Sequence, residues 1–204
     1  MALVKYNNNS LSAITSTGLD AGAMTLIKSQ TASSSSTISF VHGTSDVVLD
    51  STYPIYLFKF ININPSADEA EFLCNGSIDA GSNYNVTKST SAFSAYHQED
   101  DSSTGVGYVT GEDLAQSTSA WKLAYAVGNA ADESNCGEMW LFNPSSTTYV
   151  KHFISVSNEY GNGDLSYGSY AAGYFNVTTA LTRFQFKMSS GNIDAGTIKL
   201  YGIS

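Results

Sequence analysis

Short segments in which apolar and polar residues alternate recur along the chain from Thr37 to its last residues. Two of them, joined by a glycine-rich loop, make up the C-terminal stretch 181–204. The first segment has Phe184, Phe186 and Met188 on one face, and the second has Ile198 and Leu200 on one face. A period of two with one apolar face is typical of half-buried β-strands. We therefore expect 181–204 to form a closing hairpin with these side chains in the core.

Similar segments precede this stretch at intervals of roughly 8 to 16 residues, the spacing of an all-β sandwich or barrel. They predict strands at 37–41, 47–49, 53–63, 71–75, 84–88, 93–97, 108–110, 121–127, 137–142, 149–156 and 170–174. Residues 53–63 are apolar on both faces, which predicts a strand in the middle of a sheet. An Asn-Pro turn at 143–148 predicts that the strands flanking it pair as a hairpin. For 121–127 a helix stays open as the alternative.

These segments predict an all-β fold, a jelly-roll-like antiparallel β-sandwich with an N-terminal arm. The chain of 204 residues suits one domain with an arm, and 37–204 is the predicted sandwich. Residues 1–36 are rich in Asn, Ser and Thr and hold no long period, which favours an arm that becomes ordered against a neighbouring molecule. The alternative is that Met24 to Lys28 form an edge strand of the same domain.

The charge balance excludes one class of partner. Lys and Arg number nine against eighteen Asp and Glu, which gives a net charge of −9. Phosphate backbones are bound by basic surfaces, so we predict no nucleic-acid partner. Met1 to Ser10 lacks the apolar stretch of a signal peptide, and no run approaches the roughly 18 apolar residues of a membrane span. We therefore expect no membrane insertion.

Two groups of residues invite a metal or redox site, and both have simpler interpretations. The acidic loop from Gln98 to Asp101, next to His97, has the carboxylates that Ca²⁺ prefers, but its spacing fits no EF-hand and favours a solvated loop. Cys74 and Cys136 lack the spacing of a metal site, so we expect small buried thiols, with a disulfide as the alternative. We predict neither a metal nor a cofactor.

The sequence lacks the usual catalytic motifs. It has no Gly-x-Ser-x-Gly elbow and no phosphate-binding loop. His152 is expected to face inward with Val150 and Ile154, as an ordinary core histidine. The carboxylates available for glycoside cleavage are Glu71, Glu99, Glu112, Glu133, Glu138 and Glu159. None has an evident apolar pocket that would raise its pKa. We predict that the protein is not an enzyme and has no catalytic residues.

Loop tyrosines offer a better candidate for a contact surface. Tyr160, Tyr167 and Tyr170 flank a segment rich in glycine, 158–169, which we expect to be a long loop. Exposed tyrosines beside Gly, Ser and Asn make an adaptable surface for a protein or a glycan. The alternative is that the three rings cover the end of the sandwich.

Three stretches carry a resemblance to known proteins: MALVKYNNNSLSAITS at the start, NPSSTTYVKHF at 143–153 and SSGNIDAGTIKLYGI at 189–203. Together they resemble small virion proteins of marine tailed bacteriophages, especially cyanophages, along the whole chain. The ending alone also resembles the terminal domain of phage tail-fibre proteins. The resemblance implies a β-sandwich on the virion surface, as a tail-fibre, appendage or capsid-decorating protein, and it implies no particular functional residue.

On that resemblance we expect a homo-oligomeric structural protein of the virion. Its partners would be copies of itself and other virion proteins, the latter through residues 1–36. Two other functions stay open. One is a receptor-binding, lectin-like module that contacts host surface glycans through the 160–170 loop, and the less favoured one is a polysaccharide depolymerase.

Overall fold

The computed structural model describes residues 23–79, 81 and 83–204. Over this part the chain forms a 12-stranded antiparallel sheet system and one short 3-10 helix, η1, and has no α-helix. The elements are β1 (Met24–Thr31), β2 (Ile38–Val41), β3 (Ile55–Pro65), β4 (Ala70–Ser77), β5 (Lys88–Gln98), β6 (Thr104–Tyr108), η1 (Thr110–Glu112), β7 (Trp121–Val127), β8 (Asn135–Phe142), β9 (Lys151–Gly161), β10 (Leu165–Phe175), β11 (Arg183–Met188) and β12 (Ile193–Ile203). The all-β prediction is confirmed, and 121–127 is a strand.

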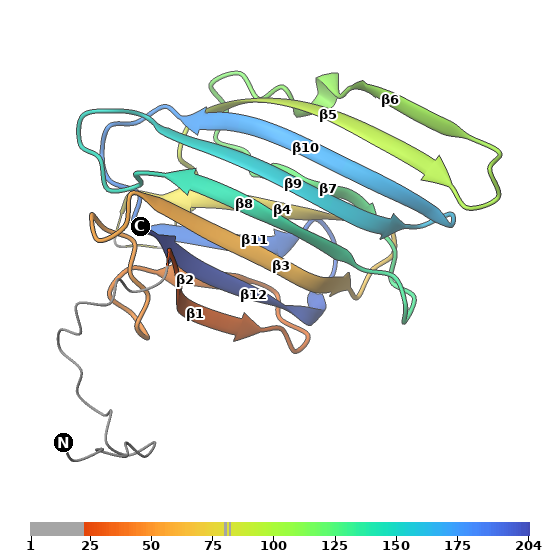
Figure 1. Cartoon of the computed structure of the whole chain (residues 1–204), viewed down its shortest axis with the longest axis horizontal. Helices are drawn as coiled ribbons and strands as arrows, with labels where there is room; N and C mark the ends of the chain where they lie inside the picture. The colour runs from red at the N-terminus through yellow and green to blue at the C-terminus, as the bar shows by residue number, and fades with distance from the viewer. Residues whose placement is uncertain (1–22, 80, 82) are drawn as a thin grey trace, which may run out of the picture.

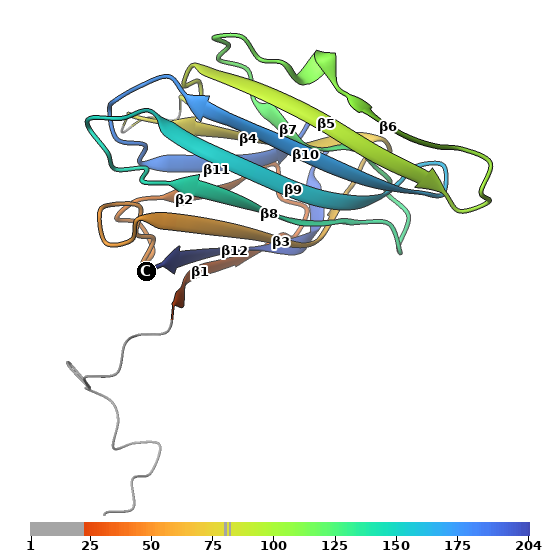
Figure 2. The ribbon, with the colours of Figure 1, turned by 45° about the horizontal axis from the view of Figure 1, so that its top comes forward.

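The strands form two layers. The large sheet has the order β1-β12-β3-β8-β9-β10-β5-β6, and the small sheet has the order β7-β4-β11-β2. Figure 1 and Figure 2 show the small sheet lying behind the large one. Among the described residues, β7 and β9 pair as strands only at Val127 and Gly161, and the side chains of Ser157 and Glu159 also hydrogen-bond to the backbone of β7. From β2 to β5 the chain changes layer at each step, and the two antiparallel layers confirm the predicted all-β sandwich.

Aromatic side chains fill the space between the layers. Phe58 of β3 lies in the large sheet and Phe186 of β11 in the small one, with ring centroids 5.2 Å apart. Phe40 of β2 meets Phe58 edge-on at 5.3 Å. All five C-terminal residues predicted for the core are buried. That prediction is confirmed, because every second residue of β11 and β12 points between the sheets.

The prediction that 181–204 forms a closing hairpin is wrong, because its two strands do not pair with each other. β11 and β12 are strands, but β11 pairs with β4 and β2, whereas β12 pairs with β3 and β1. The glycine-rich turn, which is exposed, therefore connects one layer to the other at the end of the sandwich. Alternation places the same side chains inward in a hairpin and in such a crossover, so it does not distinguish them. The predicted hairpin around the Asn-Pro turn is confirmed, since β8 pairs with β9.

The N-terminal segment joins the sheet at Met24. β1 pairs antiparallel with β12, so the edge-strand alternative for Met24 to Lys28 is the one observed. Ser35 forms a further bridge with Ile193. The remainder of the predicted arm, residues 1–22, lies outside the described residues.

Two predicted loops are largely strand. The segment 158–169 is the tight end of the β9–β10 hairpin, and its pairs run from Gly161 and Leu165 outwards. Glycine and serine lower β-propensity, but β10 is paired on both sides, with β9 and β5, and this tertiary context outweighs propensity. The second is the loop expected from Gln98 to Gly107, before a strand at 108–110, because β6 starts at Thr104. Conversely, 47–49 is not a strand, although Val47 and Leu49 are buried.

Candidate functional surface and buried carboxylates

The solvent-facing side of the large sheet, called here the outer face, is unusually apolar. Among the described residues, ten large hydrophobic side chains are exposed, and the strand registers place eight of them on this face. The eight are Met24, Leu26, Ile61, Phe93, Val106, Tyr108, Ile154 and Val156. The outward face of an antiparallel sheet is normally polar. Exposed apolar groups gathered on one face of a sheet make that face a candidate interaction surface.

Aromatic rings line one part of the outer face. Phe93 of β5 stacks on Tyr170 of β10, with centroids 4.7 Å apart and planes 3° from parallel. Tyr108 pairs with Phe93 across β5 and β6, and Ile154 and Val156 continue the surface on β9. All five residues line one shallow hollow of about 200 Å³. The hollow is therefore an apolar depression in the half of the face that ends at β6.

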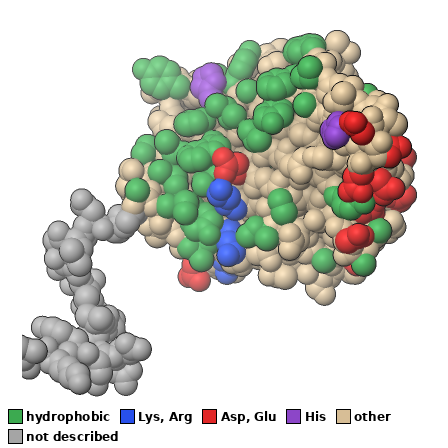
Figure 3. Space-filling model, turned by 45° about the vertical axis from the view of Figure 1, so that its right-hand side comes forward, with side chains coloured by type: hydrophobic (Ala, Val, Ile, Leu, Met, Phe, Trp, Pro, Cys, Tyr) green, Lys and Arg blue, Asp and Glu red, His purple; other side chains and the backbone are tan. Residues whose placement is uncertain are grey.

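An ion pair between Lys59 and Glu138 lies on the outer face. Lys59 Nζ lies 2.5 Å from Glu138 Oε2, and Trp140 Nε1 donates to Glu138 Oε1 at 2.8 Å. The hydrogen bond from Lys59 is the main cause that lowers the pKa of Glu138. Figure 3 shows hydrophobic side chains spread over this side of the molecule, with the lysines in one short row and acidic groups at one end. The ion pair thus neutralises the charges of Lys59 and Glu138, and the acidic groups stay apart at their end of the face.

The acidic end lies where the β5–β6 and β9–β10 turns meet. The amide of Glu99 donates to the carbonyl of Asp164 at 2.9 Å, and His97 Nε2 lies 3.0 Å from Asp101 Oδ1. Within the described ranges, no group of three or more His, Cys, Asp or Glu side chains is arranged to hold a metal ion.

The three tyrosines singled out from the sequence do not share one surface. Tyr160 and Tyr170 have the outward parity of β9 and β10, whereas Tyr167 has the inward parity. The Tyr160 hydroxyl lies 3.2 Å from Asp164 Oδ1, and this hydrogen bond is the main cause that raises the pKa of Tyr160 to about 12. The functional role predicted for this set stays a prediction, and the structure assigns its members to different sites.

Tyr167 belongs to a groove on the inner side of the β5–β6 hairpin. The groove has a volume of about 530 Å³ and is lined by Ser94, Tyr96, Tyr167, 105–111 of β6 and the turn after it. The rings of Tyr96 and Tyr167 are 10° from parallel with centroids 6.1 Å apart, and the Tyr167 hydroxyl lies 2.9 Å from Ser94 Oγ. The Tyr96 ring lies against Gly105, where a Cβ would come within 2.8 Å of it, and the space beside Gly107 is open. A flat hydroxyl-bearing molecule would fit this mixture of rings and polar groups.

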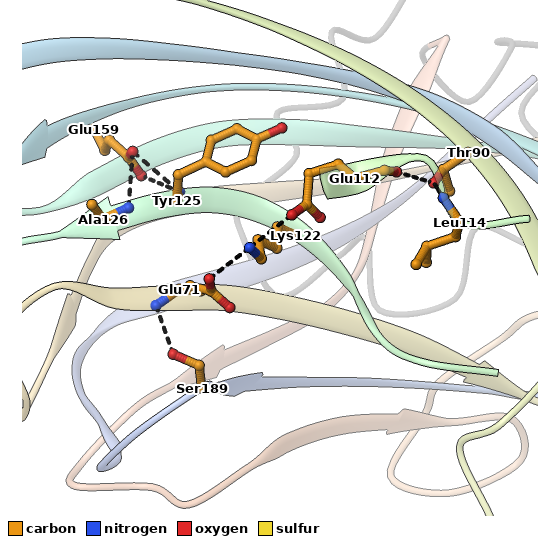
Figure 4. Close-up of polar contacts among 9 residues, drawn as sticks. All are labelled: Glu71, Thr90, Glu112, Leu114, Lys122, Tyr125, Ala126, Glu159 and Ser189. Carbon is orange, nitrogen blue, oxygen red and sulfur yellow. Dashed lines mark hydrogen bonds and ion pairs between the residues drawn. The ribbon is translucent and has the colours of Figure 1, made fainter. Parts of the chain in front are cut away.

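Glu159 is fully buried and has no basic partner in the described structure. Its carboxylate accepts hydrogen bonds from the amides of Tyr125 (2.9 Å to Oε2) and Ala126 (3.2 Å to Oε1), as Figure 4 shows. Burial raises the pKa of Glu159 to about 7. The expectation that no glutamate has such an environment is therefore wrong. Alternation along β9 carried the missing signal, because Glu159 has the inward parity of Phe153.

A second carboxylate group surrounds Lys122 of β7. Lys122 Nζ lies 2.6 Å from Glu71 Oε1 and 2.7 Å from Glu112 Oε1. Burial lowers the pKa of Lys122, but the hydrogen bonds to Glu112 and Glu71 outweigh it and leave the pKa raised. The neighbouring Tyr125 hydroxyl is buried without a hydrogen-bond partner among the described residues, and its pKa is raised by burial and by the charge of Glu112. This group holds β4, β7 and η1 together.

The prediction that His152 faces inward is wrong. It is exposed on the outer face, and its neighbours Lys151 and Phe153 are buried. Phe153 stacks on Trp121 with centroids 4.3 Å apart, which fixes the inward parity of β9. The Lys151 stem follows it inward, and Nζ donates to the Val177 carbonyl at 3.1 Å. A long aliphatic stem with a satisfied ammonium tip is compatible with the interior.

Both cysteines are free. Cys74 is buried, as predicted, and burial raises the pKa of its thiol well above the ordinary value. Cys136 is exposed on β8, where its Sγ lies 3.3 Å from Asn62 Oδ1, so the prediction of a buried thiol is wrong at this position. The disulfide alternative is also excluded by this arrangement.

The chain was compared with protein-family models, curated proteins and solved structures, and none of the three comparisons found a match. In the part of the chain that the structure describes, no helix is long and apolar enough to span a membrane.

Proposed function

We propose that the protein is an architectural component that assembles with copies of itself through the outer face of the large sheet. The observation that carries this proposal is the concentration of exposed Phe93, Val106, Tyr108, Ile154 and Val156 on adjoining strands of one face. Burying such a face between copies removes apolar surface from water, the dominant favourable term in association. The internal pairing of Lys59 with Glu138 lets the charged part of the face be covered as well.

The particle context of the proposal is the surface of a bacteriophage virion. The resemblance of 143–153 and 189–203 to virion proteins of marine tailed phages supports it. A symmetric particle contains many copies of one chain. Each copy must therefore contact its neighbours through the same surface. The proposed role is structural, as a tail-fibre, appendage or capsid-decorating protein. Immunogold labelling of intact virions from a phage that encodes this chain tests the location, and absence of label from assembled particles would contradict it.

Self-assembly has its own experiment, sedimentation velocity over a concentration series. Ile154→Glu places a charge in the lining of the apolar hollow and should weaken the outer-face contact, which shifts the protein towards smaller species. The matched control is Ile78→Glu, because Ile78 is similarly exposed (39% against 47%) but lies outside the outer face. Unchanged circular dichroism would show that both variants fold. A wild-type protein that remains monomeric at every concentration would refute the proposal.

One observation favours a second candidate function, binding of host surface glycans. The groove beside Tyr96 and Tyr167 offers parallel rings and hydroxyl groups, the combination that receives a sugar ring and its hydroxyls. Tyr167→Ala should abolish binding to a purified host polysaccharide, measured by isothermal titration calorimetry. Tyr170→Ala, on the outer face, is the control and should bind normally. Equal binding by wild type and Tyr167→Ala would exclude this groove.

A further inference from the structure

β6 is an open sheet edge. It pairs with β5 on one side, and no described strand pairs with its other side. We propose that this edge pairs antiparallel with β6 of a second copy, about a two-fold axis at Val106, so that two large sheets become one continuous sheet. This inference rests on the proposed self-assembly and names one of its contacts.

The other edges carry protection that β6 lacks. β1 contains Lys28 and a bulge between Leu26 and Lys28, both of which discourage strand addition. β2 has only four residues, and the Gln30 side chain donates to its Ser39 carbonyl at 2.9 Å. The edge of β7 is covered by side chains of β9, with Glu159 accepting from its amides. β6, by contrast, reads TGVGY, with no charge, no proline and no bulge in its register with β5.

The backbone of β6 directs hydrogen-bonding groups to the open side at three positions. Gln98 N donates to Ser103 O, and Val109 N donates to Ala92 O, so the odd-numbered residues of this ladder exchange bonds with β5. In an antiparallel pair the intervening residues point their N–H and C=O groups away. These residues are Thr104, Val106 and Tyr108. A two-fold axis at Val106 sets Thr104 opposite Tyr108 of the second copy, so all three positions find partners in one register.

Charge selects the antiparallel arrangement over the parallel one. The turn before β6 holds Glu99, Asp100 and Asp101. At the other end of β6, Asp113 accepts a hydrogen bond from the Tyr108 hydroxyl, and Glu112 is paired with Lys122. Parallel pairing would place two turns of three acidic residues side by side, which is repulsive. Antiparallel pairing separates these two turns and places each beside the end of β6 with the smaller negative charge. The same geometry is the closed, two-fold association that is commonest among protein oligomers.

The side chains of β6 on the outer and inner faces are compatible with pairing to a second β6. Val106 (78% exposed) and Tyr108 (60% exposed) lie on the outer face, so the apolar surface would continue from one copy into the next. Gly105 and Gly107 lie on the inner side, where nothing lies within 4 Å of a Cβ built at Gly107. A second backbone can therefore approach the inner side at Gly107, whereas at Gly105 the Tyr96 ring covers that side.

Paired charge variants test the two-fold register. Val106→Lys and Val106→Glu each set like charges opposite each other at the axis and should weaken association at least about tenfold. Mixing the two should restore it as a heterodimer. Thr104→Lys is the control, because residue 104 faces Tyr108 rather than itself and the loss should be much smaller. Sedimentation velocity measures all four samples. Failure of the mixture to associate, or an equal loss in Thr104→Lys, would overturn the register.

A backbone variant tests the hydrogen bonds themselves. Val106→Pro removes an amide that points away from β5, so the monomer keeps its ladder while the edge loses donors at the axis. Its association should fall by at least about tenfold. Val106→Thr keeps the amide and should retain most of the association. If Val106→Pro assembles as the wild type does, β6 pairing is wrong while outer-face assembly stands. If the wild type does not self-associate at all, the proposed function itself is wrong.

Discussion

Glu159 of β9 accepts a hydrogen bond from the backbone amide of Tyr125 of β7, with 2.9 Å between Oε2 and N. β9 belongs to the large sheet and β7 to the small one, and only the pair Val127 and Gly161 also joins them as a ladder. A single carboxylate thus supplies part of the bonding between the layers. Its environment makes that bonding dependent on pH.

Stability should fall as the pH rises through the titration of Glu159. Burial raises its pKa from 4.5 to about 7, so between these values the folded protein binds more protons than the unfolded chain. The contribution of this group is full below about pH 4.5 and is lost as the pH rises through about 7, with a total on the order of 3 kcal/mol. Urea unfolding of the wild type and Glu159→Gln at pH 5 and pH 8 measures it. From pH 5 to pH 8 the wild type should lose stability relative to Glu159→Gln. Glu99→Gln, in an exposed turn, should show the same pH dependence as the wild type.

Removal of Lys122 should leave a buried carboxylate without its partner. Lys122→Met keeps the aliphatic stem but removes the ammonium from Glu112 and Glu71, and we expect a loss of about 2–3 kcal/mol. Lys59→Met is the matched control, because the Lys59–Glu138 pair is more exposed and should cost less than about 1 kcal/mol. Glu112→Gln added to Lys122→Met should recover part of the stability. Equal losses in the two lysine variants would contradict the assignment of a buried ion pair at Lys122.

Gly173 of β10 should not tolerate a side chain. A Cβ there would lie 2.5 Å from the Ser89 carbonyl oxygen and 2.8 Å from the Phe153 ring. Gly173→Ala should therefore destabilise the protein by about 1–3 kcal/mol through overpacking. Gly107→Ala meets open space and should change the free energy of unfolding by less than about 0.5 kcal/mol. Thermal unfolding at low protein concentration measures both, and a neutral Gly173→Ala would show that β5 and β10 separate easily.

The parity of β9 can be tested with neighbouring residues. Phe153 packs against Trp121 and Phe175, so Phe153→Ala should cost about 3–5 kcal/mol. His152→Ala removes an exposed ring and should cost less than about 0.5 kcal/mol. Chemical denaturation of both variants decides the register, because the reverse order of losses would place His152 inside.

The candidate site was less predictable than the strands. Glu159 and Tyr167 have the inward parity of their strands, but parity alone does not tell that the interior at this end is polar. The polar interior depends on the backbone amide of Tyr125 in β7 contacting the carboxylate of Glu159 in β9, and these residues are 34 positions apart in the sequence. The outer face was missed for the same reason. Phe93 and Ile154 look unrelated in the sequence and become one surface only when β10 is inserted between β5 and β9.

The sequence by itself determined the fold class and the inward faces of the strands. Alternation is a local property, and it placed Phe184, Phe186, Met188, Ile198 and Leu200 in the core irrespective of strand partners. The tertiary structure decided which strands pair, and so sent β11 and β12 to opposite layers. It also decided that Glu159 is buried and that β6 is an open edge. These features depend on closing the chain over long separations, where many pairings satisfy the same alternation and only the packed whole selects one.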